Sequence, residues 1–168
     1  MKNHLCPSCR NPTQRVPRET LRALLTPHAA RRVRDAHAHR FCPASCDVVY
    51  VDEDDGSVFL KDDMSVRVGT KETVGPRPLC YCFGHSYESI ADDIATFGST
   101  SVVQDITSRC RAGDDQCRVK NPKGSCCLGQ IRAAVRALQG ESGRAFDEDG
   151  TACCGASKSV SRAPNADE

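Results

Sequence analysis

The residues in this chain best suited to chemistry are its cysteines, of which there are 12 in 168 residues. Their spacing divides them into three groups: Cys6, Cys9, Cys42 and Cys46; then Cys80, Cys82, Cys110, Cys117, Cys126 and Cys127; then Cys153 and Cys154. The N-terminal stretch lacks the apolar segment of a secretory signal, so we expect a cytoplasmic protein with reduced thiols. So many reduced thiols favour metal binding, and a disulfide scaffold is the alternative.

The first group has the spacing of a tetrahedral zinc site. Cys6 and Cys9 form a C-x-x-C pair, and Cys42 and Cys46 form a C-x-x-x-C pair. Each short pair can hold one face of a small ion, and four thiolates leave no open coordination position. We therefore predict a structural zinc site on these four residues.

Two histidines lie just before Cys42. His37 or His39 can replace one thiolate of the zinc site. The alternative is that both are solvated histidines at the end of a helix.

The second group has the number of thiols that a two-iron cluster needs. Two irons bridged by two sulfides require four thiolates in two pairs. Cys80 and Cys82 are separated by one residue, close enough to hold one iron. Cys117 with either Cys126 or Cys127 would then hold the other iron. Such a [2Fe–2S] cluster transfers one electron at a time and leaves no position for a substrate.

Two alternatives remain for the ligands of the second iron or of a modified cluster. Cys110 can pair with Cys117 in place of the later cysteines. His85 can replace a thiolate, as in Rieske-like clusters.

Neighbouring groups would tune the potential of such a cluster. Positive side chains beside the expected ligands stabilise its reduced, more negative state; they are Arg118, Lys120 and Lys123. Backbone N–H groups near Gly84 and Gly129 can donate hydrogen bonds to its sulfur atoms.

The elements that position the first group suggest an α+β module over residues 1–75. Leucines at helical spacing predict a helix from Glu19 to about His37, interrupted at Pro27. Val48–Val51 and Ser57–Leu60 predict a β-hairpin, with an Asp-Asp-Gly turn between them. The alternating residues 66–68 predict a third strand. Prolines and glycine near residue 76 mark the module boundary.

The second module, residues 76–140, is predicted to be helical. Ser86 can cap a helix with Ile90, Ile94 and Phe97 on one face, and Ser101 can cap a second. A third helix is expected from Leu128 to Leu138, ending before Gly140. Residues 141–168 are rich in Ser, Gly, Asp and Glu and are predicted to be disordered.

The charge and composition exclude several function classes. Lys plus Arg total 23 and Asp plus Glu total 22, and a net charge of +1 argues against nucleic acid as a partner. No segment approaches the roughly 20 apolar residues that a membrane span requires. The chain also lacks the common nucleotide-binding, zinc-protease and hydrolase motifs. We expect a one-electron redox protein rather than a turnover enzyme.

These motifs together resemble the N-terminal region of CopZ-type copper chaperones. The resemblance rests on the Cys6 and Cys42 pairs, on Arg40-Phe-Cys-Pro, Cys46-Asp-Val-Val-Tyr50 and Val68-Gly-Thr-Lys-Glu72, and on Cys80-Tyr-Cys82 and Asn121-Pro-x-Gly-x-Cys-Cys127. The second half also resembles bacterioferritin-associated ferredoxin domains. The C-terminal heavy-metal-associated domain of the CopZ family, with its M-x-C-x-x-C motif, has no counterpart here.

The resemblance implies both ligand sets and a function. Zinc would bind Cys6, Cys9, Cys42 and Cys46, and the [2Fe–2S] cluster would bind Cys80, Cys82, Cys117 and Cys127. The chain would then be a metallochaperone that reduces copper or hands it to an acceptor such as a copper-transporting ATPase. Cys153 and Cys154 can hold Cu(I), a soft ion.

Two other functions are alternatives. One is a ferredoxin-like electron-transfer or redox-sensing protein without a copper role. The other is a structural zinc protein whose second module also binds zinc.

Overall fold

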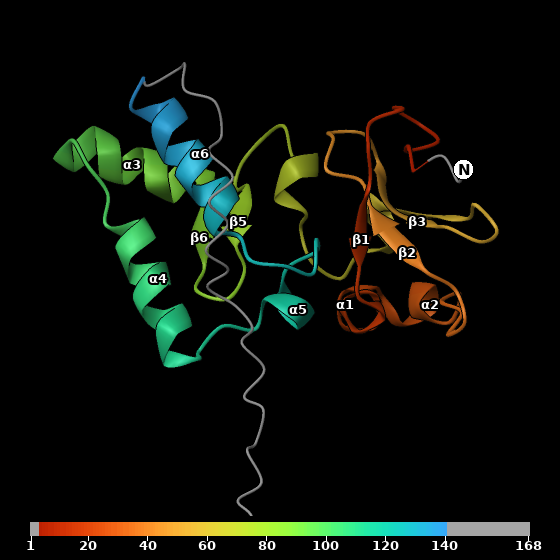
Figure 1. The fold of residues 1–168 in the computed structure, drawn as a ribbon. Helices are drawn as coiled ribbons and strands as arrows, with labels where there is room; N and C mark the ends of the chain where they lie inside the picture. Colours follow the sequence, from red (N-terminus) through yellow and green to blue (C-terminus); the bar gives the residue numbers. More distant parts are fainter. Residues whose placement is uncertain (1–3, 141–168) are drawn as a thin grey trace, which may run out of the picture.

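A four-stranded antiparallel sheet lies in the first half of the chain (Figure 1). The computed structural model describes residues 4–140. Its strands follow one another in the order β1 (Gln14–Val16), β2 (His39–Phe41), β3 (Val48–Asp52) and β4 (Val58–Leu60). The predicted hairpin is confirmed as β3 and β4, with Gly56 in the turn at φ 73°. The predicted mixture of a sheet module and helices is likewise confirmed.

Two strands of this sheet were not predicted, and one predicted strand is wrong. β1 and β2 are each three residues long and owe their conformation to pairing across the sheet. Residues 66–68 form no strand and lie between two 3₁₀ helices, η1 (Lys61–Asp63) and η2 (Gly69–Lys71). The chain is drawn away from the sheet edge because the backbone N–H and hydroxyl of Ser65 both donate to the Leu24 carbonyl at 2.8 Å.

Two short helices, α1 (Arg18–Leu24) and α2 (Pro27–Ala30), pack against the sheet. Pro27 begins α2 rather than only ending the first helix, and Thr26 caps it by accepting from the Ala29 N–H. The predicted helix extends too far, because residues 31–38 are turns and irregular chain. Leu21, Tyr50 and Phe59 are almost fully buried in the core between helices and sheet.

The second half is mainly helical. Its elements are the strand pair β5 (Pro78–Cys80) and β6 (His85–Ser86), and the helices α3 (Tyr87–Phe97), α4 (Val102–Ala112), α5 (Cys117–Lys120) and α6 (Leu128–Leu138). The three predicted helices are confirmed as α3, α4 and α6. Ser86 caps α3 as expected, but α4 begins differently, because the Thr100 hydroxyl accepts the Val102 N–H.

The two halves are packed against each other. Helix α5 lies beside α1 in the middle of the molecule (Figure 1), where the Thr20 hydroxyl donates to the Arg118 carbonyl at 2.5 Å. The Tyr50 hydroxyl donates to the Pro122 carbonyl at 2.8 Å. The predicted boundary near residue 76 stays a prediction, and the expected disorder of residues 141–168 lies outside the described residues.

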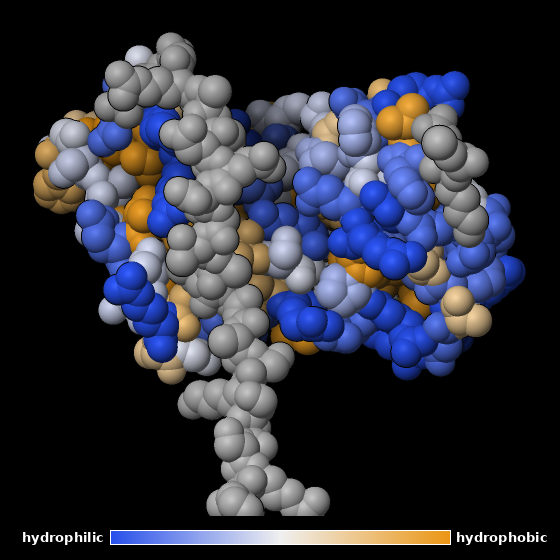
Figure 2. Space-filling model, in the orientation of Figure 1, coloured by the Kyte–Doolittle hydropathy of each residue, from blue (hydrophilic) through white to orange (hydrophobic). Residues whose placement is uncertain are grey.

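The visible surface differs between the halves. Figure 2 shows mostly hydrophilic residues over the sheet module and more hydrophobic residues over α3 and α4. Among residues 4–140, no helix is long and apolar enough to cross a bilayer.

Candidate metal centres

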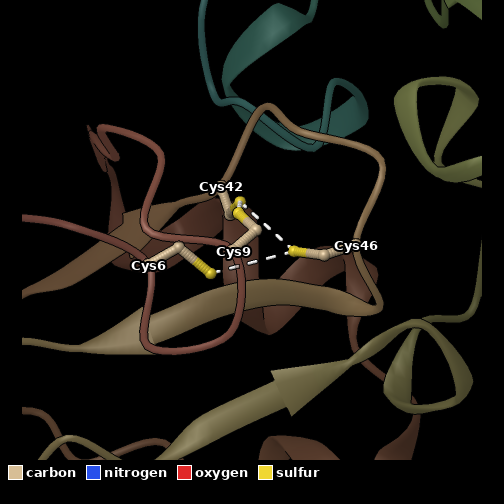
Figure 3. A group of neighbouring side chains, drawn as sticks. All are labelled: Cys6, Cys9, Cys42 and Cys46. Atoms are coloured by element: carbon tan, nitrogen blue, oxygen red, sulfur yellow. Dashed lines mark hydrogen bonds between the residues drawn. The ribbon is translucent and has the colours of Figure 1, made fainter.

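Four cysteine sulfur atoms meet at one end of the sheet (Figure 3). The Sγ of Cys6 lies 3.8 Å from that of Cys46, and the Sγ of Cys42 lies 3.7 Å from that of Cys9 and 3.6 Å from that of Cys46. A zinc ion with four bonds to sulfur of about 2.3 Å separates the sulfur atoms by about 3.8 Å. The observed distances therefore fit the edges of a tetrahedral zinc site.

Two backbone turns bring these thiols together. The Cys6 N–H donates to the Asn11 carbonyl at 2.8 Å, and the Cys6 carbonyl accepts from the Arg10 N–H at 2.9 Å. Arg10 has a φ of 62°, which lets this loop close tightly. On the other side, the Cys42 N–H donates to the Val49 carbonyl at 2.9 Å, which extends the pairing of β2 with β3.

The four thiols do not ionise equally. Hydrogen bonds from the side chain and backbone of Asn11 lower the pKa of Cys9 to about 6. Burial raises the pKa of Cys42 to about 12 and also raises that of Cys46. A cation that replaces these protons is needed before all four can be thiolates at neutral pH.

Lys71 is a functional residue that the sequence did not single out. Its side chain is buried, and Nζ donates to the Ala44 carbonyl at 2.5 Å and the Val48 carbonyl at 2.7 Å. Its charge partly opposes the rise that burial causes in the pKa of Cys42 and Cys46. Four thiolates around Zn²⁺ carry a net negative charge, which a buried ammonium offsets. The sequence feature that could have pointed to Lys71 is its position in Val68-Gly-Thr-Lys-Glu72, one of the stretches that resemble CopZ.

The two histidines before Cys42 are not solvated, so that expectation is wrong. His39 begins β2 and is only 2% exposed, and His37 is half-buried. Both contact Asp52 rather than the sulfur atoms.

The second set of cysteines converges from three segments of the chain. Cys80 ends β5, Cys117 begins α5 and Cys127 precedes α6; all three are buried. Cys82 is half-buried, and its Sγ lies 3.7 Å from that of Cys117. Cys127 interacts with both Cys80 and Cys117. In the described part of the chain this set does not form one group with all ligand atoms within 4.8 Å.

The remaining candidates near this set lie in different surroundings. Cys126 is half-buried and interacts with Cys117. Cys110 is buried on α4, among the apolar residues of the second core. His85 Nε2 lies 3.3 Å from a carboxylate oxygen of Asp105, a different environment from that of a cluster ligand.

Backbone N–H groups donate to several of these sulfur atoms. The Gln116 N–H donates to the Cys82 Sγ at 3.3 Å. A hydrogen bond with the Cys127 side chain, followed by backbone hydrogen bonds from Phe83 and Cys82, lowers the pKa of Cys80 to about 7. The N–H groups of Cys82 and Phe83 are the donors expected near Gly84, whereas Gly84 itself donates to the Cys80 carbonyl.

Of the three positive side chains expected near the second set, Lys123 interacts with its thiols. Burial lowers the pKa of Lys123, and the charges of Cys127, Cys126 and Cys117 oppose that shift. Arg118 instead forms an ion pair with Glu19 of α1 at 2.5 Å.

Comparison with known proteins decides the family. Residues 3–65 match the CopZ zinc binding domain family. The X-ray structure of the Archaeoglobus fulgidus CopZ N-terminal domain matches with a TM-score of 0.64 and 30% identity, covering 77% of this chain and 95% of that one. The chain belongs to the family of CopZ N-terminal domains. The resemblance inferred from the motifs is therefore confirmed for the CopZ-like N-terminal region.

A curated relative extends beyond this region. The copper chaperone CopZ of Archaeoglobus fulgidus is 34% identical over 129 residues, which cover 73% of this chain and 60% of the relative. The chain thus spans about 60% of the length of that CopZ protein.

Proposed function

We propose that this chain is a metallochaperone with a structural zinc site and a [2Fe–2S] cluster, and that it reduces copper and hands it on. Zinc would be held by Cys6, Cys9, Cys42 and Cys46, and the cluster by Cys80, Cys82, Cys117 and Cys127. The observation that carries the proposal is the convergence of the second thiol set from β5, α5 and α6. The copper chaperone relative supports the choice of metal.

The two thiol sets have different roles in this proposal. Four thiolates fill the coordination of zinc, so the first site holds the N-terminal loop onto the sheet and performs no reaction. When bound, a [2Fe–2S] cluster supplies one electron, which is enough to reduce Cu(II) to Cu(I). Gln116 and Lys123 would stabilise the negative charge at the second site through a hydrogen bond and a half-buried ammonium.

The sulfur distances suggest a different pairing from the one expected. Cys82 and Cys117 lie 3.7 Å apart, the spacing of two ligands on one tetrahedral metal ion. Cys80 and Cys127 also interact. We therefore assign Cys82 and Cys117 to one iron and Cys80 and Cys127 to the other.

Metal analysis of anaerobically purified protein tests the cluster. We expect visible absorption and about two irons and two sulfides per chain, together with zinc. Cys127→Ser should lose the iron and the colour, whereas Cys110→Ser should keep both. Colourless, folded protein without iron after reconstitution would exclude the cluster, and a second zinc in its place would favour a structural zinc protein.

A copper titration tests the reduction step. One equivalent of Cu(II), added without oxygen to the reduced protein, should reoxidise the cluster and leave Cu(I) bound. An unchanged spectrum after copper addition would contradict a reductase role.

The alternative is electron transfer without a copper role. Within residues 4–140 the proposed centres use eight of the ten cysteines, so copper retention falls mainly on Cys153 and Cys154, which lie outside the described residues. Replacing both with serine should abolish retention of Cu(I) in a chaperone. An intact cluster with no Cu(I) retained by either the unchanged protein or the double variant would favour the ferredoxin-like alternative.

A further inference from the structure

A group of nitrogen and oxygen ligands lies at the end of the β2–β3 pair opposite to the zinc thiols. His39 begins β2 and is paired with Asp52, the last residue of β3. Cys42 follows β2, and Cys46 precedes β3. Three strand residues therefore separate the two ends by about 10 Å, which makes them distinct sites.

Asp52 connects two imidazole rings. The Nδ1 of His37 lies 2.8 Å and 3.0 Å from the two carboxylate oxygens of Asp52. The Nε2 of His39 lies 3.5 Å from one of the same oxygens. A ligand oxygen of Asp55 lies within 4.8 Å of those of His37 and Asp52. Three potential ligands, on His37, Asp52 and Asp55, thus lie within 4.8 Å of one another, and His39 approaches the group through Asp52.

His39 provides an independent sign that a ligand belongs here. The residue is only 2% exposed, yet neither ring nitrogen has a hydrogen-bond partner within the described chain. An unsatisfied buried polar group costs about 1–3 kcal/mol, so such groups are rare in native proteins. The Nε2 atom lies 3.5 Å from an Asp52 oxygen without forming a hydrogen bond to it, a separation that a shared metal ion can bridge.

The ligand types and distances fit a transition metal ion. Bonds of about 2.0–2.1 Å in a tetrahedral site separate neighbouring ligand atoms by about 3.3–3.4 Å, close to the distance between His39 and Asp52. Imidazole and carboxylate together favour ions such as Zn²⁺, Cu²⁺ and Co²⁺ over Ca²⁺, which prefers oxygen ligands.

The surroundings orient the carboxylate and favour a cation. The Asp52 Oδ1 accepts from the backbone N–H groups of Asp54 at 2.8 Å and Asp55 at 3.2 Å, which fixes the carboxylate in place. Asp55 is paired with Arg34 at 2.9 Å, so two carboxylates and one guanidinium leave a net negative charge.

The site also borders a surface hollow of about 320 Å³, whose lining includes His37 and His39 together with Arg15, Arg18, Arg118, Glu19 and Asp35. The hollow gives a hydrated ion a route to the rings, while the negative charge that favours a cation comes from Asp52 and Asp55.

We propose that His37, Asp52 and Asp55 bind one divalent first-row transition ion through nitrogen and oxygen, and that the unpartnered His39 beside Asp52 completes the ligand set. This site is separate from both sulfur centres, and its existence does not require copper transport or an iron–sulfur cluster.

A cobalt titration of the full untagged chain, with its zinc and iron content measured first, tests the site. We expect one Co²⁺ to bind with weak d–d absorption and without the intense sulfur-to-cobalt charge transfer that thiolate ligands give. The NMR signals of the His37 and His39 rings should shift or broaden, while those of the exposed His28 should not.

Matched substitutions separate ligand loss from loss of folding. His37→Gln removes a ligand that is not fully buried and should weaken Co²⁺ binding by at least about tenfold, and His28→Gln is the control. His39→Gln should weaken binding similarly if circular dichroism shows a native fold. Equal Co²⁺ affinity in the His37 and His28 variants, or Co²⁺ bound only through sulfur, would overturn the proposal.

Discussion

Cys42 and Cys46 keep their protons in the metal-free protein because burial disfavours the charged thiolate, which raises the pKa of both. Zinc binds thiolates, so at neutral pH each of these residues must release a proton when the metal enters. Cys9, with its pKa near 6, is already ionised under those conditions.

Zinc affinity should therefore fall as the pH falls. The two protons released by Cys42 and Cys46 alone predict a loss of at least about 100-fold per pH unit near neutrality. Below about pH 6 the protonation of Cys9 adds a further proton and makes the dependence steeper. Competition with a chelator between pH 6 and 8 measures this slope, and proton release in weak buffer provides an independent count. An affinity that does not change with pH would contradict the assigned thiol states.

The buried ammonium of Lys71 should stabilise the zinc loop. Lys71→Met preserves most of the side-chain volume but removes both hydrogen bonds to the loop carbonyls. We expect a loss of about 2–4 kcal/mol in unfolding free energy, together with weaker zinc binding. Denaturant unfolding and chelator competition measure the two effects. Lys120→Met, at an exposed position, is the control and should change neither.

At the scale of the elements, the sequence predicted best where local signals were strong. The serine cap and the terminal glycine of α3, at φ 74°, appear in the structure as predicted. Ile90 and Ile94 of its predicted apolar face pack in the second core, whereas Phe97 is 75% exposed. β1 and β2 lack such signals because three residues cannot show an alternating pattern, and only their partners across the sheet make them strands.

The candidate sites could likewise be predicted only where the signal was local. The spacing of the cysteines identified the thiol ligands, because short pairs such as Cys6 and Cys9 stay close in any fold. Lys71 and Asp52 could not be found in this way, since their roles depend on residues more than ten positions away that only the folded chain brings near.

Gly69 places the segment before Cys80 close to η2. A Cβ atom at Gly69 would lie 1.9 Å from the Pro78 carbonyl oxygen, so β5 would have to move. Gly69→Ala should destabilise the protein by about 2 kcal/mol or more and, if Cys80 binds the proposed cluster, reduce iron incorporation. Gly129→Ala is the matched control, because its Cβ would contact nothing and alanine favours helix α6. Equal melting temperatures and iron contents would show that β5 adjusts freely.

At the scale of the whole molecule, a buried hydrogen bond joins the sheet module to the turn that precedes α6. Tyr50 lies in the core of the first half, yet its hydroxyl donates to the Pro122 carbonyl in the second. Burial raises the pKa of Tyr50, so this hydroxyl stays a donor across the accessible pH range.

Tyr50→Phe should weaken the contact between the halves. The buried carbonyl of Pro122 loses its donor, which predicts a loss of about 1–3 kcal/mol. Calorimetry should then show a lower melting temperature and a broader or divided transition. Tyr87→Phe on α3 is the control. Unchanged unfolding of the Tyr50 variant would mean that the halves are joined mainly by other contacts.

The seam between α1 and α5 has a practical consequence for expressing pieces of this chain. A fragment ending near residue 75 would retain every thiol of the first centre, but Thr20 and Tyr50 would lose the acceptors that residues 118 and 122 provide. Such a fragment would expose the partly apolar surface that the second half normally covers. Its poor solubility would therefore result from the loss of that half and not from a defective zinc site.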